Sequence, residues 1–217
     1  MKRIVIVMIA TLLLLCVGVL SSCTTTATWQ DQYSDTNSPL NVASDAANPS
    51  AKYIVYAALK TVNGEYVLKT GADSEVTTTA YAVVGYTGLV AELVIPEKYD
   101  NKDVVSVLAC SSEEVAGVSK YGDYELYMDG AAYTGQYAPL VNNSVVTSIT
   151  FGTKVVKVGA GVCAGMVNLT KVTFTASTAV KLGHAAFSAC NSLTTVVGTW
   201  SPETGATPFL ASGYTPQ

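Results

Sequence analysis

The chain has 217 residues, of which 49% are hydrophobic and 13% are charged, and its formal net charge at pH 7 is −4. An acidic, weakly charged chain lacks the basic patch that nucleic acids and anionic lipid headgroups require, so we expect no nucleic-acid partner. Thr, Ser, Ala, Val and Gly dominate the sequence, a composition typical of β-rich proteins outside the cytoplasm.

The first residues have the parts of a secretory signal in the required order. Lys2 and Arg3 give a positive start, residues 4–20 are almost wholly apolar, and small residues precede Cys23. The motif Leu20-Ser-Ser-Cys23 resembles the bacterial lipobox, in which the cysteine receives a diacylglyceryl group and the chain is cut just before it. Such a cysteine carries two or three acyl chains, which would hold the protein lastingly on a membrane.

Cleavage there would remove residues 1–22 as a signal peptide and leave 195 residues. The net charge of −4 would become −6, because Lys2 and Arg3 leave with the signal. An ordinary signal peptide with a chance cysteine and an uncleaved anchor are the alternatives. Thr24 follows the cysteine where aspartate would signal retention in the enteric sorting rule. We therefore expect a lipid-anchored protein of the cell envelope, at the outer membrane, that contacts the membrane through its anchor only.

Two segments follow the lipidated cysteine. Residues 23–50 are rich in Thr, Ser, Asp, Asn and Ala, which predicts a flexible tether. Residues 51–87 are expected to form an N-terminal cap. Within the cap, residues 52–69 predict a β-hairpin, because β-forming segments flank an Asn63-Gly64 pair that fits a tight type I′ turn. Residues 76–84 predict a further strand.

The last third of the chain repeats itself at an interval of 23 or 24 residues. Copies begin at Val146, Leu169 and Leu193, the third of which fades, and residues 90–107 share their spacing. In each copy, alternating apolar positions predict a short inward-facing strand, and a second short strand follows about five residues later. Stacking such coils would bury their apolar sides. Residues 88–200 thus predict a mainly β, right-handed solenoid with a ladder of parallel strands.

The repeat resembles a known family. Residues 182–193 read Leu-Gly-His-Ala-Ala-Phe-Ser-Ala-Cys-Asn-Ser-Leu. They resemble the BspA-type leucine-rich repeat, which runs roughly I-G-x-x-A-F-x-x-C-x-x-L, and residues 80–109 resemble the entry repeat of that family. Val162-Cys163 and Met166 depart from the Ala-Phe and Cys of the pattern, so the copies are degenerate. The family mostly comprises secreted or surface proteins, some of them adhesins, and the resemblance implies a short leucine-rich-repeat solenoid at the cell surface.

Residues 110–143 interrupt the repeats as an acidic, tyrosine-rich insertion, which should leave the stack as a loop or subdomain. Tyrosine offers a large contact area at low entropic cost, and acidic neighbours favour a cationic or sugar-like partner. The alternative is that these tyrosines only hold the insertion on the solenoid. The candidate binding residues are Tyr121, Tyr124, Tyr127, Tyr133 and Tyr137.

The outward side of the predicted strand ladder is the second candidate surface. Its hydroxyl-rich rows include Thr150, Lys171 and Thr173, which we expect to point away from the core. The alternative is a solvated sheet face without a partner, since threonine favours strands in any case.

Candidate catalytic and metal-binding sets are absent from the sequence. His184 is the single histidine, it falls in the bend of a repeat, and no G-x-S-x-G motif accompanies it. No closely spaced cysteine ligand pairs predict a zinc site. Asp100, Asn101 and Asp103 do not form a calcium-loop pattern and are better explained by a turn. We expect no enzyme, no cofactor and no metal.

Three cysteines remain after Cys23. One disulfide among Cys110, Cys163 and Cys190 stays open as an alternative, but Cys163 and Cys190 fall at apolar repeat positions. These positions favour buried thiols that act as small hydrophobic side chains.

The expected function is that of a non-enzymatic, lipid-anchored repeat protein that binds a protein or glycan at the cell surface, in host or cell-surface adhesion. The alternatives are a structural scaffold of the bacterial envelope and a carbohydrate-binding accessory protein. Residues 201–217 are expected to form a C-terminal tail.

Overall fold

The computed structural model describes residues 48–216, which all belong to one compact unit of the chain. The predicted signal peptide, Cys23 and nearly all of the predicted tether lie outside these residues. The fold is mainly β, with helical structure limited to two 3-10 turns, η1 (Ala51–Tyr53) and η2 (Gly71–Asp73). Within residues 48–216, no helix has the length and apolar character of a membrane span.

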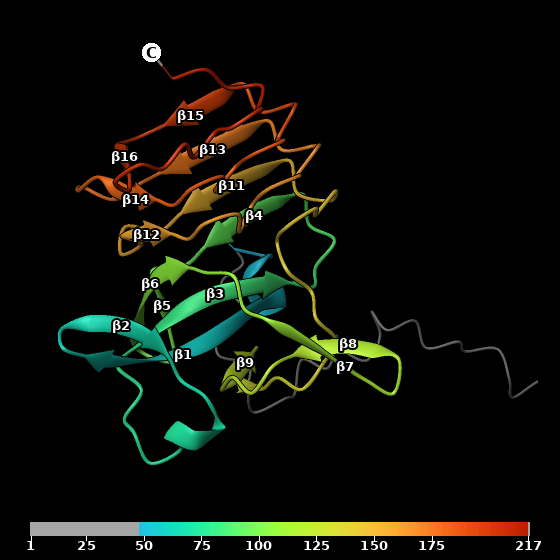
Figure 1. Ribbon diagram of the computed structural model, residues 1–217, viewed down its shortest axis with the longest axis vertical. Coiled ribbons are helices and arrows are strands. Elements are labelled where there is room, and N and C mark those ends of the chain that lie inside the picture. Colours follow the sequence, from blue (N-terminus) through green and yellow to red (C-terminus); the bar gives the residue numbers. More distant parts are fainter. Residues whose placement is uncertain (1–47, 217) are drawn as a thin grey trace, which may run out of the picture. The chain divides into compact units, whose positions relative to one another are not determined.

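The strands are mostly short and follow one another in the order of Figure 1. They are β1 (Ile54–Val62), β2 (Glu65–Leu68), β3 (Ala80–Tyr86), β4 (Glu92–Ile95), β5 (Lys98–Tyr99), β6 (Lys102–Val107), β7 (Ser112–Val115), β8 (Val118–Tyr121), β9 (Leu126–Met128), β10 (Ala131–Ala132), β11 (Ser148–Phe151), β12 (Lys157–Val158), β13 (Lys171–Phe174), β14 (Val180–Leu182), β15 (Thr195–Val197) and β16 (Trp200–Pro202).

Two ladders of parallel strands run through the stacked coils (Figure 1). One is the four-stranded sheet β4-β11-β13-β15, and the other contains β3, β6, β12, β14 and β16 in that order. The register of the four-stranded sheet follows the sequence repeat, since Ile149 pairs with Leu93 on one side and Val172 on the other. The predicted stack of parallel-strand coils is therefore confirmed, and residues 90–107 supply one of its coils.

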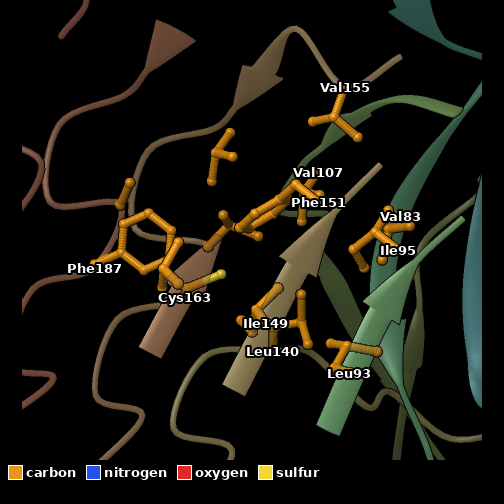
Figure 2. Packing of buried hydrophobic residues seen from close by; sticks show 14 of the residues in the cluster. Val83, Leu93, Ile95, Val107, Leu140, Ile149, Phe151, Val155, Cys163 and Phe187 are labelled. Atoms are coloured by element: carbon orange, nitrogen blue, oxygen red, sulfur yellow. The ribbon is translucent and has the colours of Figure 1, made fainter. Parts of the chain in front are cut away.

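The space between the ladders holds the main hydrophobic core. Figure 2 shows Leu93, Ile149 and Phe151 directed into it from neighbouring strands. Phe151 stacks on Phe174 with ring centroids 5.0 Å apart, and Phe187 meets the Phe151 ring edge-on at 6.3 Å. Phe151 and Phe174 occupy the same position of successive coils, and Phe187 lies in the coil of Phe174. Each coil therefore buries its apolar side against its neighbours.

The last coil extends beyond the predicted limit at residue 200. Strand β16 pairs in parallel with β14, and the amide of Phe187 donates to the carbonyl of Pro208. Phe209 stacks on Phe187 at 5.5 Å and joins the core. The segment 201–217, expected as a tail, thus begins as part of a coil. The missed signal is the spacing, because Phe209 follows Phe187 by 22 residues.

The N-terminal cap contains the predicted hairpin. Strands β1 and β2 pair antiparallel from Leu59–Leu68 to Val62–Glu65. Asn63 and Gly64 have φ angles of 51° and 84°, as a type I′ turn requires at both central positions. The strand predicted at residues 76–84 is β3, which begins at Ala80, so its start was placed too early.

The insertion folds back on the cap instead of standing away from it. Strands β7 and β8 form a hairpin, and β9 pairs with β1. Side chains of the insertion cover the outer faces of β1, β3 and β6, which creates a second hydrophobic core. The chain has rejoined the main core at Leu140. Burial of β1 and β3 on both faces explains why they are almost continuously apolar.

Candidate binding surfaces

Most of the predicted tyrosines pack in the second core. Tyr121 is 5% exposed, and its ring meets that of Tyr137 edge-on at 4.8 Å. The Tyr137 hydroxyl donates to the carbonyl of Cys110 at 2.8 Å, and the Tyr133 hydroxyl donates to that of Gln136 at 2.8 Å. Burial raises the pKa of Tyr121 and of Tyr137. These contacts are what the packing alternative expects, while a binding role for the tyrosines stays a prediction.

Tyr127 lies in a different cluster, with Tyr56, Tyr81 and Tyr99. The rings of Tyr56 and Tyr99 stack at 4.1 Å, and Tyr81 meets Tyr127 edge-on at 5.8 Å. The Tyr127 hydroxyl donates to Glu125 at 2.5 Å, and this bond together with burial raises the pKa of Tyr127 to about 12. Tyr56 and Tyr81 belong to the main core, and Tyr99 and Tyr127 pack against it.

A pocket of about 300 Å³ lies on the insertion. It brings together three of the five predicted tyrosines with three charged side chains, and its lining includes Tyr121, Tyr124, Tyr133, Glu113, Lys120 and Asp123. Tyr124 shares a hydrogen bond of 3.2 Å with Ser111. Aromatic faces beside charged and hydroxyl groups are suited to a small polar ligand such as a sugar ring. Tyr127 and Tyr137 do not line this pocket.

The outer face of the four-stranded sheet carries the second set of predicted residues. Its strands stand in exact sequence register, so side chains at matching positions form rows across the sheet. One row contains Val94, Thr150, Thr173 and Val197, and the next contains Glu92, Ser148, Lys171 and Thr195.

Thr150 and Thr173 are therefore neighbours, and Lys171 lies in the adjacent row. Neighbouring strands lie about 4.8 Å apart, which sets the spacing within each row. All eight side chains of the two rows are exposed or partly exposed. Lys171 takes no part in the ion pairs found among residues 48–216. The face offers regularly spaced hydroxyls around one cation.

A shallow depression of about 650 Å³ lies at the C-terminal end of the coils. Its lining includes Val196, Trp200 and Tyr214, and several threonines complete it. Trp200 and Tyr214 both meet the Phe209 ring edge-on, at 5.0 and 4.9 Å. The sequence did not predict this surface, because residues 201–217 were expected to form a tail. The Phe209 spacing would have revealed it.

The ring of the single histidine, His184, hydrogen bonds to a threonine and, within residues 48–216, to no carboxylate. His184 is exposed, and its Nδ1 lies 3.2 Å from the hydroxyl of Thr207. Residues 48–216 hold no group of three or more His, Cys, Asp or Glu side chains that could bind a metal ion.

The three cysteines of the described part are buried free thiols. Cys190 donates to the carbonyl of Cys163 at 3.1 Å, and both side chains belong to the main core, as their repeat positions predicted. Burial raises the pKa of Cys110 to about 12 and also raises that of Cys163. Such thiols are poor nucleophiles at neutral pH.

No family model, curated protein or solved structure matches the chain. The resemblance to BspA-type repeats therefore rests on residues 80–109 and 145–198 alone and stays a prediction. The stacked parallel coils are the part of that prediction that the structure contains.

Proposed function

We propose that the protein is a non-enzymatic, lipid-anchored repeat protein of the bacterial cell envelope that binds another macromolecule in host or cell-surface adhesion. The observation that carries the proposal is the outer face of the sheet β4-β11-β13-β15. Its side chains stand in register, and Ser148 and Thr195 flank Lys171 in the same row. A regular, weakly charged face of this kind is suited to an extended protein or glycan that contacts several coils at once.

The anchor and the repeat type belong to the same proposal. The lipobox-like motif supports a lipid on Cys23 and a place at the outer membrane, and residues 182–193 support a right-handed BspA-type leucine-rich repeat. His184 is solvent-exposed, and within residues 48–216 its ring hydrogen bonds to Thr207 and to no carboxylate, which supports a function without catalysis.

Binding of the purified full chain to extracellular-matrix proteins and a glycan panel tests the proposed face. Lys171→Glu should weaken binding by about tenfold, because it replaces the one cation of the face with an anion. Lys181→Glu is the matched control, since Lys181 is also exposed but lies on β14 of the opposite ladder. Equal losses in both variants, or binding to no member of the panel, would count against the proposal.

The anchor is tested separately in the native bacterium. Cys23→Ser should move the protein from the membrane fraction to the soluble fraction, since the thiol that accepts the lipid is gone. Protease treatment of intact cells should cut the wild-type protein. Protection from protease, together with crosslinks to bacterial envelope proteins only, would favour the scaffold alternative.

The pocket on the insertion supports a second candidate, a carbohydrate-binding role. Tyr124→Ala should then abolish binding of the recognised sugar, since it removes a ring that lines the pocket. Tyr66→Ala is the control, because Tyr66 is 48% exposed on β2, outside the pocket. Sugar binding that survives Tyr124→Ala would exclude this pocket.

A further inference from the structure

The two ends of the four-stranded sheet are protected differently. At the first end, the side-chain amide of Asn48 donates to the carbonyl of Val94 on β4 at 3.0 Å. The amide of Val94 in turn donates to the hydroxyl of the buried Ser50 at 3.0 Å. Side chains thus satisfy the central backbone groups of this edge, and a further strand cannot pair with them.

The other end of the sheet is an open edge. Strand β15 is the last strand of its sheet and β16 the last of the second ladder, and no strand within residues 48–216 pairs with their outer sides. An unpaired edge is a template for another strand. Val197 on β15 is 46% exposed, and Leu210, further along the last coil, is 53% exposed. Trp200 and Tyr214 line the depression beside it.

Charge is almost absent from this end. Residues 193–216 contain one charged side chain, Glu203, and its carboxylate pairs with Lys157 of an earlier coil at 2.8 Å. Natural edge strands are usually protected by exposed charges, and none protects β15. Two copies of an acidic chain repel each other over most of their surfaces, but this end adds no charge that would keep them apart.

We propose that this end is the contact between two copies of the chain, which meet tail to tail with their β15 strands paired antiparallel. A twofold contact must be self-complementary. Pairing centred on Val196 sets Thr195 of one copy opposite Val197 of the other, and both residue types favour strands and cross-strand contact. Head-to-tail stacking is disfavoured, because Asn48 and Ser50 occupy the β4 edge.

The pairing has a consequence for the proposed adhesion. Asn48, where the described chain begins, contacts β4 at the far end of the sheet from β15. A tail-to-tail pair therefore places the two Asn48 residues at opposite ends of the assembly. With the proposed lipid on Cys23, such a pair is suited to join two facing membranes. This consequence rests on the proposed anchor, whereas the pairing itself does not.

Analytical ultracentrifugation of the full chain in detergent tests the pairing. The wild-type protein should show a concentration-dependent monomer–dimer equilibrium. Val197→Lys should raise the dimer dissociation constant by about tenfold or more, because it places cations close together across the new strand pair. Val62→Lys is the matched control, since Val62 is 43% exposed at the tip of the β1–β2 hairpin, and it should leave the equilibrium unchanged.

A charge-swap experiment distinguishes direct contact from misfolding. The Val197→Lys and Val197→Glu variants should each be monomeric, and an equimolar mixture of the two should form dimers again. Circular dichroism should show that each variant keeps the wild-type fold. A wild-type chain that stays monomeric at all concentrations, or a mixture that does not dimerise, would overturn the proposal. Both results concern pairing at the β15 edge, whereas binding by the outer face is tested separately by Lys171→Glu on β13.

Discussion

The cap with its insertion and the coils that follow it are built on different principles. In the cap, β1 and β3 are buried on both faces, between the main core and the second core. In the coils from β11 onward, each strand faces the main core on one side and solvent on the other. The cap gains its stability from contacts between segments far apart in sequence, and each coil gains it from its immediate neighbours.

A short solenoid can thus be stabilised at one end and keep an unpaired strand edge at the other. The cap adds a second core, two ion pairs and side chains that occupy the β4 edge. The last coil has no second core, its ion pair between Glu203 and Lys157 is exposed, and it keeps an open edge. Substitutions in the cap and in the coils should therefore lower the free energy of unfolding by different amounts.

The largest expected effect is in the coils. Phe187 is fully buried and contacts the ring of Phe174 in its own coil and those of Phe151 and Phe209 in the coils on either side. Phe187→Ala should lower the free energy of unfolding by about 3–5 kcal/mol, since it leaves a large cavity. Phe209→Ala is the comparison and should cost less, because the last coil has a neighbour on one side only. Denaturant unfolding measures both, and equal losses would contradict the nearest-neighbour account.

In the cap, a buried ion pair should give the next largest effect. The Lys69 side chain is 3% exposed, and its ammonium lies 2.6 Å from the Glu125 carboxylate. Glu125→Gln should cost about 2 kcal/mol in denaturant unfolding, less than a fully buried pair because Glu125 is partly exposed. Glu203→Gln breaks the exposed ion pair with Lys157. A loss of stability in this variant as large as that in Glu125→Gln would contradict the ranking.

The cap should also be the acid-sensitive region. Burial acts to raise the pKa of Glu125, but the hydrogen bonds from Lys69 and Tyr127 outweigh it, so the pKa is lowered. A hydrogen bond from Lys60 lowers the pKa of Asp73 to about 2. Carboxyls with lowered pKa stabilise the fold above their unfolded values and lose this contribution as pH falls. Stability should thus decline below about pH 4, and less steeply in Asp73→Asn; an unchanged slope would refute this assignment.

The smallest expected effect concerns the contact between the insertion and the cap. Tyr137→Phe removes the hydroxyl that donates to the Cys110 carbonyl and should cost about 1 kcal/mol in denaturant unfolding. Tyr66→Phe should cost nothing measurable, because Tyr66 is exposed on β2. A loss in Tyr137→Phe no larger than that in Tyr66→Phe would show that the insertion is held by its apolar contacts alone.

The coils could be predicted from the sequence because each is specified by a short pattern of apolar residues that repeats along the chain. Leu93, Ile149 and Val172 repeat at one position of a short pattern, and the observed register pairs them. The Asn63-Gly64 turn is local in the same way.

The rest depends on contacts between distant segments. The sequence does not show that Tyr121 would pack on the outer faces of β1 and β3, nor that Asn48 would occupy the edge of β4. The same holds for the binding surfaces. The Thr150 and Thr173 row follows from the repeat, whereas the pocket on the insertion and the depression at the last coil require the folded chain.

Amide hydrogen exchange, residue by residue, tests the difference between the two regions most directly. It should be measured on the full-length Val197→Lys variant, so that self-association does not protect β15. We predict the strongest protection in β1, β3 and β6, intermediate protection in β11 and β13, and rapid exchange at the outer edges of β15 and β16. Protection that is uniform along the coils, or strongest in β15 and β16, would contradict a solenoid with one protected end and one open end.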